Sequence, residues 1–203
     1  MTAQAVSLKS TISVADSELV ARAIAGREES FEELVRRYQR PIAAYVYRMV
    51  GDYDAALDLT QEVFIRVYGS LARYRSEFKF STWIYRIAHN AAIDHLRRQG
   101  ASRTEEMEVA GEGGSTFEKP LASGAPSPEQ ESEREERRAE IEGVVLNLPP
   151  AYRELIVLRH AHDLSYDEIA EVTGLPLGTV KNRIFRAREA MRTLLVERGI
   201  TSM

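Results

Sequence analysis

Aromatic and basic side chains are interleaved in one stretch of the chain, a pattern suited to holding unpaired nucleotides. The aromatic members are Phe78, Phe80, Trp83 and Tyr85, and the polar and basic ones are Arg75, Lys79, Arg86, Asn90, Arg97 and Arg98. Rings stack on unpaired bases, while cations hold the sugar–phosphate backbone. The pattern favours single-stranded nucleic acid as a ligand. The alternative is that Trp83 and Tyr85 are core residues of a small helical domain, and for Trp83 both interpretations stay open.

A second group of residues suited to nucleic acid lies on the last predicted helix, from Thr179 to about Val196. Its polar face carries Lys181, Asn182, Arg186, Arg188 and Arg192, with Arg183 at the border, opposite an apolar stripe of Val180, Ile184, Ala187, Met191 and Leu194. Arg and Lys bind guanine edges or phosphates, and Asn binds adenine. A short helix precedes it, with Ser165 and Glu168 predicted as a capping box and Gly174 as its end. The pair predicts a DNA-binding helix-turn-helix; the alternative is a helical hairpin with a solvated basic face.

A third group could bind a protein. Asp58, Gln61, Glu62 and Ile65 stand at positions i, i+3, i+4 and i+7 of a predicted helix over 52–71. We expect them opposite a packed stripe that includes Leu57, Phe64, Val67, Tyr68 and Leu71. The outward face is either a docking surface or an ordinary solvated face.

Covalent catalysis finds no support in the sequence. There is no cysteine, no phosphate-binding glycine loop and no nucleophile motif. His160 and His162 lack a carboxylate or cysteine cluster for zinc, and His89 and His95, six residues apart, do not share a helical face. We therefore predict no enzyme, no catalytic residue, no metal and no cofactor. A self-standing regulator with the same helix-turn-helix would need a receiver or ligand domain, and no βαβ pattern is present for one.

These residues need helices to position them, and the periodicity predicts an all-α chain of two small helical domains. We expect a disordered tail over 1–13, a first domain over 14–100, a flexible acidic linker over 101–131 and a second domain over 132–198. In the first domain, Pro41 should kink a long helix, Gly51 should end it, and the helix from Ser81 should end at Gly100.

The charge distribution separates the linker from the rest. The net charge is −4, but the segment 104–137 holds ten acids against three bases and so carries −7, which leaves +3 elsewhere. Local basic patches matter more for DNA contact than the total. No apolar run reaches the roughly 18 to 20 residues that span a bilayer, and the N-terminus is no secretory signal. We expect a soluble, cytoplasmic protein with no direct membrane insertion.

Four runs of sequence carry a specific resemblance to a known family. They are DLTQEVFIR at 58–66, FSTWIYRIAHN at 80–90, LSYDEIA at 164–170 and GTVKNRIFRAR at 178–188. In this order, on both sides of a linker, they resemble the extracytoplasmic-function (ECF) sigma factors of the sigma-70 family. The resemblance covers about 17–100, similar to sigma region 2, and 132–198, similar to the region 4 helix-turn-helix.

The resemblance implies partners for each group of residues. Core RNA polymerase, through the β′ clamp helices and the β subunit, would bind Asp58, Gln61, Glu62 and Ile65. A base flipped from the promoter −10 element would be held by Tyr74, Arg75, Lys79, Phe80, Trp83, Tyr85, Arg86 and Asn90. The −35 element would be read by Thr179, Lys181, Asn182, Arg183, Phe185, Arg186 and Arg188. Control by an anti-sigma factor is also implied.

Overall fold

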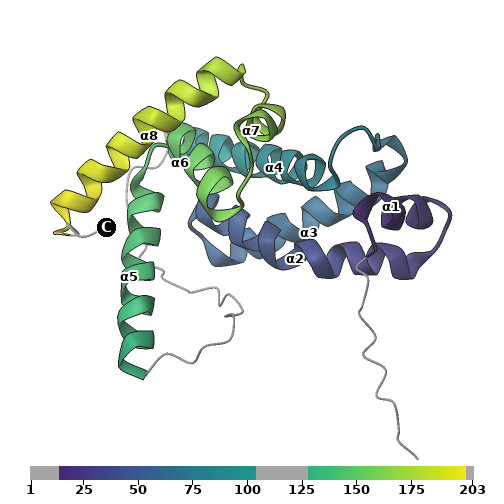
Figure 1. Cartoon of the computed structure of the whole chain (residues 1–203), viewed down its shortest axis with the longest axis horizontal. Helices are drawn as coiled ribbons and strands as arrows, with labels where there is room; N and C mark the ends of the chain where they lie inside the picture. The colour runs from purple at the N-terminus through teal and green to yellow at the C-terminus, as the bar shows by residue number, and fades with distance from the viewer. Residues whose placement is uncertain (1–13, 104–127, 200–203) are drawn as a thin grey trace, which may run out of the picture.

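A computed structural model describes residues 14–103 and 128–199, with the backbone alone for 101–103 and 128–136. Within these ranges the chain is helical and has no β-strand (Figure 1), so the predicted all-α class is confirmed. The predicted tail over 1–13 and most of the predicted linker, 104–127, lie outside the described residues. No helix of the described ranges is both long and apolar enough to cross a bilayer.

The first half of the chain is a bundle of four helices. They are α1 (Asp16–Ile24), α2 (Glu28–Val50), α3 (Tyr53–Ser70) and α4 (Phe80–Arg103), with a 3₁₀ turn at Leu71–Arg73 between the last two. Leu34, Tyr45, Val63 and Ile84 are fully buried between them. Burial of each of the three aliphatic side chains, Leu34, Val63 and Ile84, contributes about 1.5–3 kcal/mol. This core therefore holds α4 against the other helices of the bundle.

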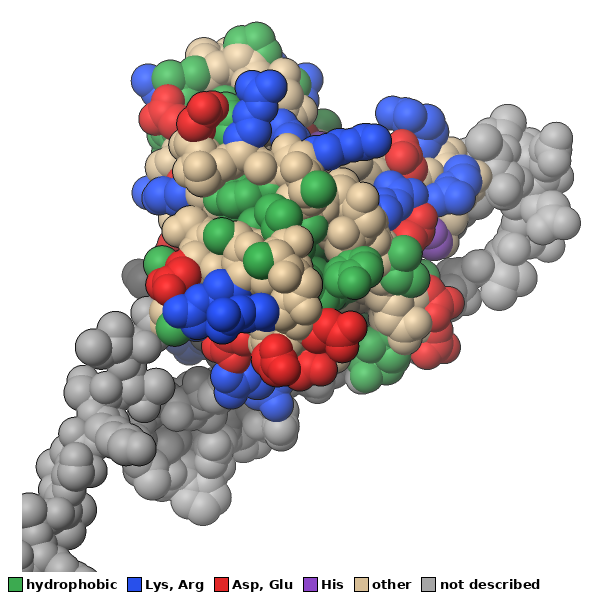
Figure 2. Space-filling model, turned by 90° about the vertical axis from the view of Figure 1, so that its right-hand side faces the viewer, with side chains coloured by type: hydrophobic (Ala, Val, Ile, Leu, Met, Phe, Trp, Pro, Cys, Tyr) green, Lys and Arg blue, Asp and Glu red, His purple; other side chains and the backbone are tan. Residues whose placement is uncertain are grey.

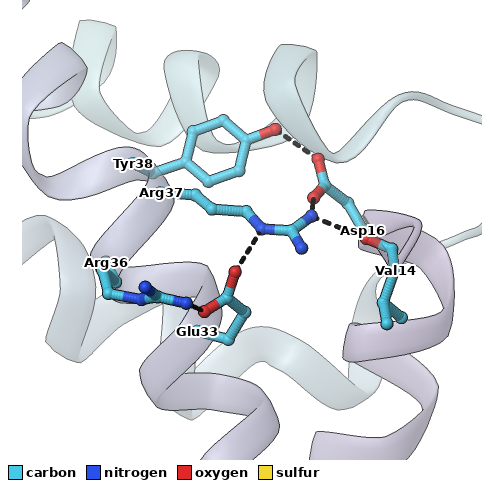
Figure 3. Close-up of polar contacts among 6 residues, drawn as sticks. All are labelled: Val14, Asp16, Glu33, Arg36, Arg37 and Tyr38. Carbon is cyan, nitrogen blue, oxygen red and sulfur yellow. Dashed lines mark hydrogen bonds and ion pairs between the residues drawn. The ribbon is translucent and has the colours of Figure 1, made fainter. Parts of the chain in front are cut away.

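A polar cluster fastens the short helix α1 to α2 (Figure 3). The Arg37 guanidinium donates to Asp16 Oδ1 at 2.8 Å and to the Val14 carbonyl at 2.7 Å, and the Tyr38 hydroxyl donates to Asp16 Oδ2 at 2.5 Å. Glu33 accepts from Arg36 and Arg37, which lower the pKa of its carboxyl. The cluster fixes the point where the described chain enters the bundle.

Several helix boundaries differ from the sequence prediction. The helix α2 runs through Pro41, as expected, and ends at Gly51, whose φ is +78°. The helix α4 begins at Phe80 and passes Gly100 to end at Arg103, so glycine at 100 does not stop it. On α3, Leu57 is 37% and Tyr68 62% exposed, so the prediction that these two side chains face the core is wrong.

The second half contains the predicted helix-turn-helix. Its helices are α5 (Pro128–Asn147), α6 (Pro150–Ile156), α7 (Tyr166–Thr173) and α8 (Leu177–Glu197), with a π-helical turn at Val157–Ala161. Ser165 and Glu168 form the predicted capping box at the start of α7. Gly174 has φ of +71°, a conformation that favours glycine and lets the chain turn sharply into α8.

The two halves pack against each other, an arrangement that the sequence left open. The helix α7 lies along α4, and α5 and α6 contact α2 (Figure 1). One continuous set of buried apolar residues runs from Leu34 in α2 to Ile184 in α8. Arg48 on α2 pairs with Glu142 on α5 at 2.8 Å. The described chain is therefore a closed, two-part body.

Candidate nucleic-acid and protein interfaces

A small cavity of about 320 Å³ lies where the 71–80 segment meets α4. Seven of its lining residues come from the first half, namely Arg73, Tyr74, Arg75, Phe78, Thr82, Trp83 and Arg86, and Glu171 comes from α7. The Tyr74 and Trp83 ring centroids are 5.4 Å apart, and the Tyr74 hydroxyl donates to the Phe78 carbonyl at 2.6 Å. Rings and guanidinium groups surround a space large enough for a nucleobase. Figure 2, which faces this end of the molecule, shows basic side chains interspersed with apolar ones.

The predicted −10 residues divide between this cavity and the core. Tyr74, Arg75, Trp83 and Arg86 line the cavity. Lys79, Arg86 and Asn90 are exposed, Tyr74 and Trp83 are half-buried, and Phe80 and Tyr85 are buried. Phe80 packs on Tyr74, Trp83 and Tyr38, so its role in this structure is to support the cavity wall.

Four cavity residues were not among the predicted −10 residues. Arg73, Phe78 and Thr82 lie within or beside the aromatic and basic run, so that run was the signal for them. Glu171 is distant in sequence and enters through the packing of the two halves. No local pattern identifies such a residue.

The predicted DNA face of α8 is open to solvent. Lys181, Asn182, Arg186 and Arg188 are exposed, and Phe185 is 66% exposed, while Thr179 and Arg183 are half-buried. Val180, Ile184 and Ala187 on the opposite side are buried. A guanidinium nitrogen of Arg188 lies 3.4 Å from Nε2 of His160. Burial of His160 and the nearby charge of Arg188 lower the pKa of that histidine. The helix α8 is thus packed into the core on one side and exposes basic side chains on the other.

The outer face of α3 is more apolar than the sequence predicted. Asp58, Gln61 and Ile65 are exposed, and Glu62 pairs with Arg66 on the same helix at 2.5 Å. Leu57 and Tyr68 join Ile65, which is 72% exposed. Exposed apolar side chains with a polar rim mark protein contact surfaces. The face combines an aliphatic and aromatic centre with the predicted carboxylates.

A wide groove runs between the halves, bounded by α2, α5, α8 and the 157–161 turn. Its volume is about 1270 Å³, and apolar side chains such as Ala44, Val157 and Met191 lie among its lining. Eight arginines line it: Arg36, Arg37, Arg40, Arg48, Arg137, Arg138, Arg188 and Arg192. The acids in the lining are Glu142, Asp163 and Glu189, and Asp16 and Glu33 pair with Arg36 and Arg37 from outside it. The groove therefore suits an amphipathic and acidic occupant.

Titratable side chains are buried where α4 meets α6. His89 and Glu154 are 7% and 6% exposed, with Nδ1 of the histidine 3.8 Å from Oε2 of the glutamate. The Tyr45 hydroxyl lies 3.2 Å from the same Nδ1. Burial lowers the pKa of His89 to about 4 and raises the pKa of Glu154 to about 7. Both groups are therefore favoured in their neutral forms.

Comparison with known protein families defines the class of the molecule. Residues 34–102 match the family model described as Sigma-70 region 2, and residues 138–191 match Sigma-70, region 4. The two matches fall on the two halves of the structure, one on the bundle with the cavity and one on the helix-turn-helix. This is a transcription initiation factor of the sigma-70 class.

Individual relatives narrow the assignment. The ECF RNA polymerase sigma factor SigW of Bacillus subtilis is 39% identical over 170 residues, 84% of this chain and 91% of the relative. The solved structure of CnrH in complex with the cytosolic domain of CnrY shares 25% identity, covers 91% of this chain and 99% of its own, and has a TM-score of 0.66. The sigma factor RpoE of Bartonella quintana, solved with the anti-sigma factor NepR, shares the fold at 22% identity, 82% and 97% coverage and a TM-score of 0.65. The chain belongs to the ECF family of RNA polymerase sigma factors.

Proposed function

We propose that this sigma factor divides promoter recognition between the cavity and α8. The exposed basic side chains of α8 bind the −35 duplex in its major groove. The cavity holds a base from the melted −10 element between Trp83 and the surrounding arginines. The cavity carries this proposal, because it joins rings, cations and a space large enough for a nucleobase in one place. The chain acts in the cytoplasm, where polymerase and chromosome meet.

The free energy of base stacking on this chain is comparable to the cost of opening a few base pairs, so promoter opening needs no covalent chemistry by the chain itself. Stacking on aromatic side chains contributes about 1–3 kcal/mol per base. Opening DNA costs about 1.4 kcal/mol for each base-pair step. Capture of one or two bases therefore offsets the opening of a few steps, and the polymerase performs the synthesis.

The domain division follows from the same assignment. We place the −10 and polymerase functions in 14–100 and the −35 function in 132–198, with the segment 101–131 joining them. The backbone of α4 and α5 extends a few residues into the proposed linker from both sides. Proteolysis in the absence of partners tests the division, with cuts expected inside 104–127 and not inside the helices.

The decisive experiment is binding to core polymerase followed by run-off transcription on a genomic fragment library. Binding with defined start sites supports the proposal and also yields the promoter sequence. Failure to bind core polymerase, with duplex DNA binding retained, would favour a self-standing regulator instead.

The α3 face is expected to dock the β′ clamp helices. The double variant Asp58→Ala with Glu62→Ala should weaken core binding by about tenfold or more, as truncations at contact centres do. Measurement of Kd by fluorescence anisotropy checks this. The double variant Glu29→Ala with Glu32→Ala removes two exposed acids from α2 and should bind like the parent. Equal affinity for all three proteins would sink the assignment.

Asn90 is expected to contribute to base capture. It is exposed on α4 one turn beyond Arg86, and Asn90→Ala removes a donor and an acceptor for a base edge. The rate of promoter opening should fall roughly threefold to tenfold, the effect of one hydrogen bond, while closed-complex affinity is kept. Permanganate footprinting over time separates the two steps. Gln99→Ala, exposed on the same helix, is the control, and equal losses in both steps would contradict the prediction.

We infer that an anti-sigma factor controls the chain. The Bartonella quintana structure holds a sigma factor of this fold with such a partner. The groove lined by arginines is the candidate surface here, since its charge favours an acidic amphipathic segment. An anti-sigma factor acting this way competes with core polymerase in size-exclusion chromatography, and formation of a ternary complex would count against it.

A further inference from the structure

The helix α7 lies across the base of the proposed −10 site. Its apolar side, Ile169 and Val172, is fully buried, and α4 is its main neighbour in the first half. These buried side chains fix both the position and the rotation of α7. The charged side chains on its remaining faces are therefore held at fixed places beside α4.

Two carboxylates of α7 lie at the proposed −10 site. Glu168 Oε1 lies 2.8 Å from Lys79 Nζ, and Glu171 lines the cavity with Trp83 and Arg86. The contact with Lys79, together with the Ser165 backbone amide, lowers the pKa of Glu168 to about 2. Glu168 is thus negatively charged at any physiological pH.

A further contact joins α4 of the first half to the second half of the chain. The Tyr85 hydroxyl lies 2.6 Å from Nδ1 of His162, with ring centroids 4.8 Å apart. Tyr85 is 5% exposed in this arrangement. One of the proposed base-binding rings is therefore occupied within the protein.

We propose that the closed chain masks its own −10 site, with Glu168 and Glu171 in place of DNA phosphates. The inference rests on the proposed function of the cavity. A carboxylate and a phosphate compete for the same cation, so Lys79 cannot pair with Glu168 and with a DNA phosphate together. Glu171 adds negative charge to the cavity that Arg86 also lines. The basic side chains of α8 stay exposed in the same structure. Masking therefore affects the −10 site and leaves the −35 face accessible.

The masking contacts are individually weak, so α7 can separate from the −10 site and return to it. Lys79 has a side chain that is 74% exposed, and exposed ion pairs contribute little to stability. Their effect on DNA affinity is larger than their effect on folding stability, because they place negative charge where a phosphate would bind. Promoter DNA or polymerase can therefore displace α7 at low cost.

The test uses the full chain and its single tryptophan, Trp83, as the reporter. A mixed-sequence single strand of about 12 nucleotides, within the usual site size, is titrated while Trp83 fluorescence is followed. The variant is Glu168→Gln with Glu171→Gln. Glutamine at 168 keeps the capping box with Ser165, so the charge is removed and the helix start is kept.

The variant should bind the strand roughly threefold to tenfold more tightly than the parent. Any loss of acidic charge favours DNA, so the control is Asp167→Asn with Glu189→Gln, which removes the same charge away from the cavity. Glu171→Gln alone touches no helix cap and should shift affinity in the same direction. Circular dichroism melting confirms that each variant is folded.

The outcomes separate the two levels of the proposal. Tighter binding by the variant than by its charge-matched control supports masking. Equal affinity of variant and control, with clear quenching of Trp83, overturns masking and leaves the −10 assignment intact. Absence of quenching in every protein overturns the −10 assignment, and masking with it.

Discussion

Replacement of Arg153 by methionine is expected to lower the free energy of unfolding by about 3 kcal/mol, since a charged donor to several buried acceptors is lost. The guanidinium donates to the Met49 carbonyl at 2.5 Å, to the Leu148 carbonyl at 3.1 Å and to the Leu146 carbonyl. These carbonyls lie at the ends of α2 and α5, where helices leave acceptors unsatisfied. One side chain on α6 thus joins both halves of the chain.

Urea unfolding measures the effect of this replacement. Methionine keeps most of the aliphatic length of arginine, so lost hydrogen bonds dominate over lost packing. Arg66→Met is the control, because Arg66 makes an exposed pair with Glu62 and should cost less than about 1 kcal/mol. A loss at Arg153 no larger than the loss at Arg66 would show that the guanidinium does not hold the halves together.

The buried pair of His89 and Glu154 is expected to give opposite pH dependences when either partner is removed. Glu154 has a folded pKa of about 7 against an ordinary 4.5, so its contribution is present below pH 4.5 and lost as pH rises to 7. His89 has a folded pKa of about 4 against 6.5, so its contribution is present above pH 6.5 and lost as pH falls to 4. Each amounts to at most about 3 kcal/mol.

In the parent chain the two slopes cancel between pH 4.5 and 6.5, where we expect a nearly constant free energy of unfolding. Glu154→Gln leaves His89 alone, and the variant should lose stability on acidification from pH 6.5 to 4. His89→Asn leaves Glu154 alone, and this variant should lose stability as pH rises from 4.5 to 7. Urea titrations at half-unit pH steps measure both. Slopes of the same sign would mean that burial does not control the two groups.

Local signals predicted the helix-turn-helix well. The capping box at Ser165, the glycine at 174 and the apolar stripe of α8 each act within a few residues, so sequence alone was sufficient. Helix ends were less predictable. Gly100 costs a helix only about 1 kcal/mol, and the structure continues α4 past it to Arg103.

The faces of α3 were harder to assign, since apolar residues occur on both sides of that helix. Leu57 and Tyr68 share a stripe with Ile65, which the structure exposes, whereas Val63 and Val67 are buried. Periodicity identifies a stripe but not which of two stripes packs inward. The entry of Glu171 into the cavity depends on contacts between distant segments, which no local pattern encodes.

The length of chain between α4 and α5 sets how far the halves can travel from each other. The helices end and begin at Arg103 and Pro128, with 24 residues, 104–127, between them. A fully extended chain reaches at most about 3.3–3.6 Å per residue, or about 85 Å for this tether. Promoter elements named for positions 25 base pairs apart are separated by about 85 Å of duplex at 3.4 Å per pair. An extended segment of this length would therefore allow the halves to separate by a distance of this order.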